Sequence, residues 1–410
     1  MSDTTFSTPW LTIIGIGDNG LASLTPEGQA YLDAAETVVV AERVEQAVPL
    51  AGKDVLRWAD GFDNTVEAIR QRRGRPVTVL ATGDPMHFGI GATLLTYFDV
   101  AEARVLPSPS AFSLAAARLG WPLQSAVQIS LHARPVELIN RHLLPGARIL
   151  ALTSDGSTVG KVARILVDRG FGASVLHVLE HMGGPEERIL RMTAGELLAQ
   201  APDIAQFNTL AIDCASDGAL LSPVPGLPDD AFRHDGQLTK REVRAATLSL
   251  LQPFPNALLW DVGAGCGSVA IEWMRSGMGT RAIAIESKPE RLAMIRENAV
   301  ALGAPDLVTI EGEAPAALDG LEAPDVVFIG GGITVDGLFD ACWRGLKPGG
   351  RLVANAVTIE GEARLAELRG LYGGELTRIS VARAAPVGRY CGWKSLMPVT
   401  LLSLTKGRDA

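Results

Sequence analysis

Three glycines at alternate positions, Gly263, Gly265 and Gly267, follow an apolar run that ends at Asp261. Glycine lets the backbone adopt positive φ angles and lets a ligand approach the main chain closely. The apolar run predicts a buried parallel strand, and the residues after the glycines have the apolar spacing of a helix. Ligands of such sheets lie beyond the carboxyl ends of the strands, so this turn predicts a nucleotide-type ligand bound against the backbone.

The spacing of the glycines in this turn indicates which kind of nucleotide ligand the turn binds. A dinucleotide fold requires another glycine three residues after Gly265, where this chain has Ser268. A Gly-x-Gly-x-Gly turn after an acidic strand end resembles the first motif of class I S-adenosylmethionine (SAM) methyltransferases. Glu286 ends the next predicted strand, at the distance where an acid accepts the ribose hydroxyls. The resemblance implies that these residues hold SAM: Thr239, Asp261, Gly263, Ala264, Gly265, Cys266, Gly267, Glu286, Glu313 and Ala314.

The order of elements after residue 258 predicts a Rossmann-like domain. Residues 307–318 are expected to contain a third strand that ends at 311–314, residues 325–332 a fourth strand that opens into a loop, and residues 346–357 a turn and a fifth strand. The fold that this order resembles has a seven-stranded, mostly parallel sheet that ends in an antiparallel hairpin. Residues 375–385 and 396–404, rich in leucine or β-branched positions, are expected to form that hairpin.

Another glycine-rich turn follows the first predicted strand of the chain. Gly15, Gly17 and Gly20 fit the dinucleotide pattern Gly-x-Gly-x-x-Gly, so a nicotinamide or flavin domain is an alternative. Thr25 is a candidate N-cap and Pro26 a first-turn proline, so the helix is expected to begin well beyond the glycines. A pyrophosphate bound at the glycines would then lie away from the helix N-terminus that should hold it, which argues against a dinucleotide site.

Residues 76–95 and 103–124 contain a Gly-Asp-Pro turn and a Pro-Ser-Pro-Ser turn, each after a predicted strand. Together with the first glycine turn they resemble the tetrapyrrole methylase family, which binds SAM in a cleft between two α/β subdomains. The chain departs from that family at Asp18, where proline is usual. An ordinary β-turn at residues 83–86 is the simpler alternative. The resemblance implies cofactor contacts at Gly15, Gly17, Gly83, Asp84, Pro85 and Ser110.

The remaining residues of the first half are expected to form the second subdomain of the tetrapyrrole methylase fold. Its strands are expected near residues 127–131, 148–153, 173–179 and 209–214. His177 and His181 are four residues apart, but they follow a β-rich run and do not share a helical face. We therefore expect no metal site.

A run rich in proline and glycine at residues 217–236 predicts a linker between a domain at 1–216 and a domain at 237–410. Structure is expected to resume as a helix at 238–251 with Thr239 as its N-cap. In class I methyltransferases of this type the helix covers the cofactor mouth.

Composition limits the class of protein. The 410 residues are 47% hydrophobic and 20% charged, with a net charge of −9 and four scattered cysteines. These values predict a globular, two-domain protein without a disulfide framework, and they argue against a nucleic-acid binder. The polar N-terminus and the lack of long apolar runs predict a cytoplasmic protein that does not span a membrane.

A tetrapyrrole methylase joined to a class I methyltransferase resembles the family of bifunctional, decarboxylating precorrin-6Y C5,15-methyltransferases of cobalamin biosynthesis. The family implies two SAM sites per chain, methylation of a precorrin at C5 and C15, loss of carbon dioxide from the C12 acetate, and a homo-oligomer. The alternatives are a methyltransferase acting on another tetrapyrrole or an RNA base, and a non-catalytic SAM sensor or scaffold. Precorrins carry carboxylates, which suit arginine. Candidate substrate contacts are Arg241, Arg244, Gly331, Asn355, Arg383 and Arg389.

Overall fold

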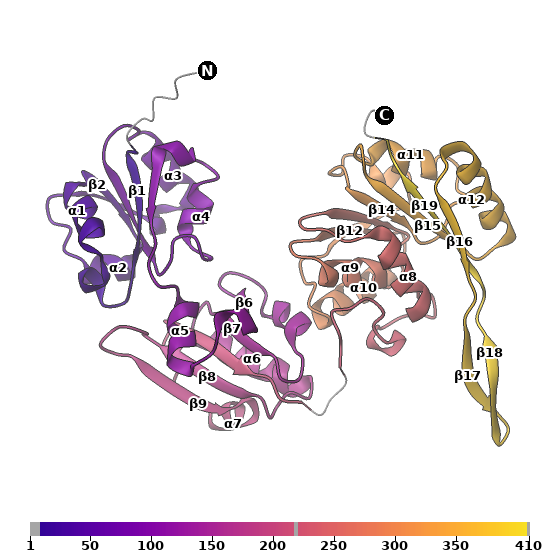
Figure 1. Ribbon diagram of the computed structural model, residues 1–410, viewed down its shortest axis with the longest axis horizontal. Coiled ribbons are helices and arrows are strands. Elements are labelled where there is room, and N and C mark those ends of the chain that lie inside the picture. The colour runs from indigo at the N-terminus through magenta and orange to yellow at the C-terminus, as the bar shows by residue number, and fades with distance from the viewer. Residues whose placement is uncertain (1–8, 217–219, 408–410) are drawn as a thin grey trace. The chain divides into compact units, whose positions relative to one another are not determined.

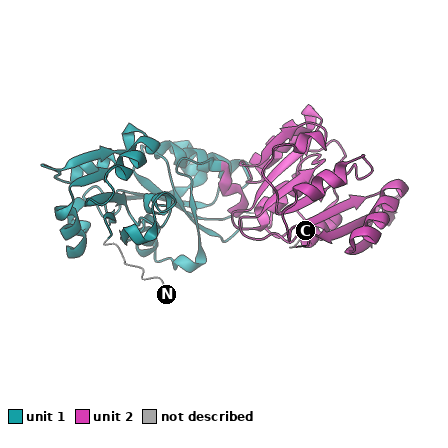
Figure 2. Ribbon diagram, turned by 90° about the horizontal axis from the view of Figure 1, so that it is seen from above, with its two compact units in different colours: residues 1–136, 145–218 teal, residues 137–144, 219–410 magenta. Residues whose placement is uncertain are grey.

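The computed structural model describes residues 9–216 and 220–407 of the chain. The chain forms two compact units, one of residues 1–136 and 145–218 and the other of residues 137–144 and 219–410 (Figure 2). Part of the predicted linker, residues 217–219, lies outside the described residues, and the predicted domain boundaries stay predictions. Each unit is described by itself.

The first unit begins with a five-stranded parallel sheet in the order β3-β2-β4-β1-β5 (Figure 1). Every residue of β1 and β2 is buried, which explains their continuous apolar sequences. The strands are β1 (Leu11–Ile16), β2 (Thr37–Val40), β3 (Asp54–Arg57), β4 (Val77–Thr82) and β5 (Ala103–Leu106), and the helices are α1 (Pro26–Ala34), α2 (Glu42–Ala47), α3 (Phe62–Arg70) and α4 (Ile90–Leu94).

The start of α1 confirms the argument against a dinucleotide site. Thr25 caps the helix by accepting a hydrogen bond from Gly28 N at 3.1 Å, and Pro26 is its first residue. A short 3-10 helix, Gly20–Ser23, separates the glycine turn from α1. The helix N-terminus is therefore not at the glycines, where a pyrophosphate would require it.

The second sheet of the first unit is mixed, in the order β6-β7-β10-β8-β9. β6 and β7 are parallel, and β8 runs in their direction because β10 is antiparallel to both β7 and β8. The edge strand β9 was not predicted. The elements are β6 (Ala126–Ser130), β7 (Arg148–Leu152), β8 (Val175–Glu180), β9 (Arg188–Thr193) and β10 (Asn208–Asp213), with α5 (Ala111–Leu119), α6 (Gly156–Asp168) and α7 (Ala194–Gln200).

The second unit contains the predicted seven-stranded sheet, in the order β13-β12-β11-β14-β15-β19-β16. The first five strands are parallel, and β19 is antiparallel to its neighbours β15 and β16. The strands are β11 (Leu258–Val262), β12 (Arg281–Glu286), β13 (Val308–Glu311), β14 (Val326–Ile329), β15 (Arg351–Ala356), β16 (Glu375–Ile379) and β19 (Val399–Thr405). The helices are α8 (Arg241–Leu251), α9 (Ser268–Ser276), α10 (Pro289–Ala301), α11 (Leu338–Gly345) and α12 (Ile359–Tyr372).

The predicted C-terminal hairpin differs from the observed one. Instead of continuing to residue 385, β16 ends at Ile379, and the chain leaves the sheet as a separate ribbon of β17 (Ala382–Val387) and β18 (Tyr390–Ser395) (Figure 1). Large apolar residues of this ribbon, Val387, Tyr390 and Trp393, are exposed, so they do not contribute to the core of the unit.

The predicted N-cap of α8 is also wrong. The helix begins at Arg241 with Lys240 as its N-cap residue, one position later than expected, and no side chain caps it. Within residues 9–216 and 220–407, no helix combines the length and apolar character needed to cross a membrane.

Candidate active site

The glycine turn of the second unit lies at the carboxyl end of β11. Gly263, Gly265 and Gly267 all have positive φ angles, between 61° and 79°, which side chains disfavour. A Cβ atom on Gly263 would come no nearer than 3.8 Å to another residue, but one on Gly267 would lie 3.0 Å from Ile295 of α10. Gly263 therefore leaves room for a ligand, whereas Gly267 permits the close packing of helices.

Asp261 is a buried acid beside this turn, with 1% of its surface exposed. Its Oδ2 atom accepts a hydrogen bond from Ala270 N at 3.0 Å, and its buried Oδ1 atom has no partner among the described residues. Burial raises the pKa of Asp261 to about 7, and the negative charge of Glu286 acts in the same direction. Such an acid is poised to take up a hydrogen-bond donor or a positive charge from a ligand.

Glu286 is the last residue of β12, and its carboxylate forms hydrogen bonds with the backbone of two neighbouring loops. Its Oε2 atom accepts a hydrogen bond from Gly265 N at 2.9 Å, and Oε1 accepts one from Lys288 N at 3.1 Å. The guanidinium of Arg291 lies 4.0 Å from Oε1 and also holds Asp235 at 2.8 Å. The position at the strand end leaves the carboxylate able to accept further hydrogen bonds from a diol.

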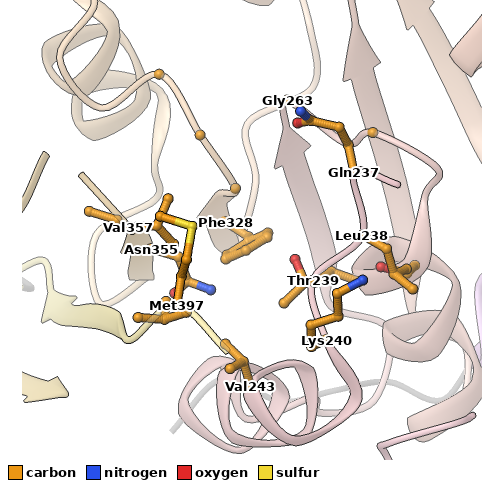
Figure 3. Close-up of a pocket in the computed structure, with 18 of the residues that line it drawn as sticks. Gln237, Leu238, Thr239, Lys240, Val243, Gly263, Phe328, Asn355, Val357 and Met397 are labelled. Atoms are coloured by element: carbon orange, nitrogen blue, oxygen red, sulfur yellow. The ribbon is translucent and has the colours of Figure 1, made fainter. Parts of the chain in front are cut away.

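These residues line a pocket of about 890 Å³. Residues 237–240 lie along one side, Asn355, Val357 and Met397 lie on the opposite side, and Phe328 stands between them (Figure 3). The strand ends of β11, β12 and β14 thus form the floor, and a loop, a helix start and the foot of the ribbon form the walls. The volume is within the range of small-molecule sites.

Asn355, on β15, presents a polar group to this pocket. Its Nδ2 atom donates a hydrogen bond to Thr247 Oγ1 of α8 at 3.0 Å. Its buried Oδ1 atom has no partner in the described part of the chain. An unsatisfied buried acceptor is costly, so a ligand that donates to Oδ1 would gain from it.

The pocket brings together half of the cofactor and substrate candidates from the second half of the sequence: Thr239, Asp261, Gly263, Ala264, Gly265, Glu286, Gly331 and Asn355. Cys266, Gly267, Glu313 and Ala314 are not among its lining residues. The loop that holds Glu313 is nevertheless adjacent, since Gly312 N donates to the Glu286 carbonyl oxygen at 3.1 Å.

The candidate arginines have different surroundings. Arg244 is fully buried: its Nε atom donates to Glu272 at 2.6 Å, and its Nη atoms bond to Asp229 and to backbone carbonyl oxygens. This placement removes Arg244 from the candidate substrate contacts. Arg383 is held by the carboxylates of Asp229 and Glu242, at 2.9 and 2.6 Å.

Two candidate arginines are exposed. Arg241 is the first residue of α8, next to the pocket-lining Lys240. Arg389 is at the tip of the ribbon with its guanidinium over the ring of Tyr390. Both can therefore approach an anionic ligand.

Sequence reasoning missed several lining residues. Arg291 belongs to the first turn of α10, five positions after Glu286, and that spacing could have revealed it. Met397 and its neighbours reach the pocket only because the chain returns from the ribbon, and nothing in the local sequence indicates this.

In the first unit, three loops meet at the carboxyl ends of adjacent strands. A Cβ atom on Gly15 of β1 would lie 2.4 Å from the carbonyl oxygen of Gly83, after β4, and 2.6 Å from Ser108 Cβ, after β5. Only glycine allows this approach, which explains Gly15 structurally. The structure thus brings the first-half candidates to one edge of the sheet.

The remaining first-half candidates shape these loops. Gly17 N donates to Ser23 Oγ at 2.8 Å, Asp84 Oδ1 accepts from Met86 N at 2.8 Å, and Ser110 Oγ caps α5. Pro85 packs against Gly91, where a Cβ atom would lie 2.8 Å from the proline ring. These contacts fix the loops, whose role in binding a cofactor stays a prediction.

Comparison with known proteins identifies both halves. The family described as tetrapyrrole (corrin/porphyrin) methylases matches residues 10–198, and the family described as precorrin methyltransferase domain matches residues 230–406. A Sinorhizobium sp protein named precorrin-6Y C(5,15)-methyltransferase [decarboxylating] is 49% identical over 409 residues, which cover 99% of this chain and 98% of that protein.

Two shorter relatives each align with less than half of the chain. One, from Pyrobaculum calidifontis, is named a probable cobalt-precorrin-6B C(15)-methyltransferase (decarboxylating), with 36% identity over 44% of this chain and 95% of that protein. The other, from Salmonella typhimurium, is named a cobalt-precorrin-7 C(5)-methyltransferase, with 28% identity over 44% of this chain and 88% of that protein. The full-length match shows that the chain belongs to the family of decarboxylating precorrin-6Y C5,15-methyltransferases.

Proposed function

We propose that this chain uses SAM to methylate precorrin-6Y at C5 and C15 and that it decarboxylates the C12 acetate side chain. The observation that carries the proposal is the second-unit pocket, where a glycine turn, Asp261 and Glu286 line one cavity in a chain of this family. We also propose two SAM sites per chain, the other at the loops around Gly15 and Gly83 in the first unit.

The residues of the second unit fit SAM. A ligand can approach the backbone at Gly263 closely, because no other residue that the structure describes fills the space beside it. Glu286 at the strand end can accept hydrogen bonds from the ribose hydroxyls. The unpartnered Oδ1 of Asp261 can accept from the amino-acid part of the ligand. When bound, SAM supplies a methyl group on a positively charged sulfur.

The chain's own task in methyl transfer is mainly orientation. Transfer from a sulfonium to an electron-rich ring carbon depends on alignment and on exclusion of water, which a walled pocket provides. Apolar side chains of Val243, Phe328 and Met397 give this pocket a surface for a macrocycle. Decarboxylation needs an electron sink, and the conjugated ring itself can supply one.

We assign one methyl transfer to each unit, with C5 methylation in the first unit and C15 methylation and decarboxylation in the second. Relatives with only one of these activities in their names align with less than half of the chain, which supports a division by unit. Arg241 and Arg389 are the candidate partners for substrate carboxylates, because both are exposed and neither forms an ion pair with a carboxylate in the described residues.

The test is a reaction of the full chain with precorrin-6Y and SAM carrying a ¹³C-labelled methyl group. We expect two labelled methyl groups, at C5 and C15, and the loss of one carbon dioxide, measured by mass spectrometry and NMR. Gly265→Arg would fill the second-unit pocket and abolish the C15 transfer and decarboxylation. Gly83→Arg, also at a positive φ, would abolish the C5 transfer. Both transfers surviving in Gly265→Arg would contradict the division.

Two further points stay proposals: a cytoplasmic location and a homo-oligomer. Exposed apolar side chains on the ribbon, including Tyr390 and Trp393 at 67% and 80% exposure, support self-association. Light scattering of the purified chain tests the oligomer, and a monomer would contradict it.

A further inference from the structure

Loops from the two sheets of the first unit meet at one pair of side chains. Asp18 lies two residues after β1, and His181 directly follows β8. The Oδ2 atom of Asp18 lies 3.0 Å from His181 Nδ1. A Cβ atom on Gly184 would lie only 2.4 Å from the same oxygen, so the backbone of the β8–β9 loop also approaches the carboxylate closely.

The surroundings fix Asp18 and one face of the imidazole. Asp18 also forms an ion pair with Arg43, whose guanidinium lies 3.5 Å from the ring centre of Phe207. The ring of His181 contacts the same phenylalanine edge to face, at 5.7 Å between centres. A carboxylate that holds Nδ1 of a histidine fixes the tautomer and leaves Nε2 to act.

The Nε2 atom of His181, which is not held by Asp18, lies near Glu186. It lies 3.9 Å from an oxygen of Glu186, whose side chain is 78% exposed, while the side chain of His181 is 24% exposed. Asp18 itself is only 10% exposed. The pair thus has a largely buried carboxylate at one end and a partly exposed imidazole at the other.

His181 also has an unusual backbone conformation, with φ at +47°. Few residues other than glycine adopt this region, and such conformations concentrate at functional sites. The pair is next to the proposed cofactor loop, because Asp18 directly follows Gly17. Asp18 is also the position where the sequence departs from the tetrapyrrole methylase pattern.

We propose that His181 accepts the proton released by methyl transfer in the first unit and that Asp18 is its positioning residue. This inference rests on the proposed function of that unit. In the step, the ring carbon uses an electron pair of the conjugated system to form the new bond to the methyl carbon. The bond between sulfur and that methyl carbon breaks, with its electrons staying on sulfur. The methylated ring is left with one positive charge. A C–H or N–H bond of that ring then breaks, its proton goes to Nε2 of His181, and its electron pair stays in the ring, which restores the neutral conjugated system.

The charged groups around His181 define its expected pH response. They are Asp18, Glu186, Arg43, and the buried ion pair of Glu180 with Arg188. Only a neutral imidazole can accept a proton, so the C5 transfer should slow once acid protonates His181.

The main test is His181→Gly, because glycine tolerates the φ of +47° and the variant should fold. We expect C5 methylation to fall about 10²- to 10⁴-fold. Free imidazole in the buffer should restore part of it, and the acid limb of the pH–rate profile should disappear. Asp18→Asn should lower kcat for the C5 transfer with little change in KM.

The matched control is His132→Gln, since His132 lies at the same edge of the second sheet and contacts the Thr153 carbonyl oxygen rather than an acid. It should keep the wild-type pH profile. A readout besides activity is calorimetric binding of S-adenosylhomocysteine, which His181→Gly should leave unchanged.

Wild-type rate and pH profile in His181→Gly, or a loss that imidazole does not restore, would overturn the proposal. Failure of the wild-type chain to methylate C5 at all would instead refute the proposed function.

Discussion

The buried ion pair of Arg244 and Glu272 should be critical for the second unit. The two side chains are 0% and 2% exposed, and Nε lies 2.6 Å from Oε1. Glu272 also accepts hydrogen bonds from Gly226 N and Leu227 N, at 2.6 and 3.0 Å. Arg244 bonds to the carbonyl oxygens of Leu227 and Thr239. The pair therefore ties the segment that forms one wall of the pocket to α9.

The perturbation is Glu272→Gln, which keeps the shape of the side chain and removes its charge. It removes the nearer of the two carboxylates beside the buried guanidinium and leaves Asp229 at 3.3 Å, so the cost should be about 3 kcal/mol, the lower end of the range for breaking a buried ion pair. For a unit of this size that corresponds to a fall in melting temperature of roughly 6–12 °C. Scanning calorimetry of the full chain should show the shift in the second-unit transition, with weaker binding of S-adenosylhomocysteine to that unit.

The matched control is Glu322→Gln. Glu322 pairs with Arg281 in the same unit through two hydrogen bonds, at 2.6 and 2.7 Å, but both side chains are more than half exposed. Exposed pairs are screened by water, so this control should hardly move the transition. Equal, small shifts in the two variants would refute the reasoning that Arg244 is a structural residue.

Three more predictions concern the pocket. Between the usual pKa of 3.8 and the raised value of about 7, folded Asp261 holds a proton that the unfolded chain has lost, so the stability of the second unit should fall as pH rises through that window, by roughly 4 kcal/mol at most. Asp261→Asn should remove this slope in denaturant unfolding, and an unchanged slope would contradict the assignment. Gly263→Ala and Gly267→Ala both place a side chain at a positive φ and should each destabilise the unit by about 1–3 kcal/mol. Gly267→Ala should destabilise it more, because its Cβ atom also meets Ile295, whereas only Gly263→Ala should also weaken S-adenosylhomocysteine binding in calorimetry; the opposite pattern would argue against their different roles. Asn355→Leu should keep the fold and slow only the C15 transfer, and an unaffected rate would exclude Asn355 as a substrate contact.

Features set by spacing along the chain could be predicted from the sequence. The strand ending near Asp261, the glycine turn, α9 and the acid at Glu286 follow one another within one βαβ unit, and the structure has each of them. The same holds for Thr25 and Pro26, because a helix start depends on adjacent residues.

Features set by distant contacts could not be predicted. Thr239 lies one position before the N-cap residue of α8, and its carbonyl oxygen accepts a hydrogen bond from Arg244, which Glu272 holds from another helix. The ribbon departs at Ile379 although the β-type pattern continues. Asp18 and His181 are 163 positions apart, so only the fold reveals their contact.

The most direct test of two methyltransferase modules in one chain is calorimetric titration of the full chain with S-adenosylhomocysteine. We expect two sites per chain, one of which disappears in Gly265→Arg while the other keeps its affinity. A single site in the wild-type chain, or loss of all binding in Gly265→Arg, would contradict two independent modules.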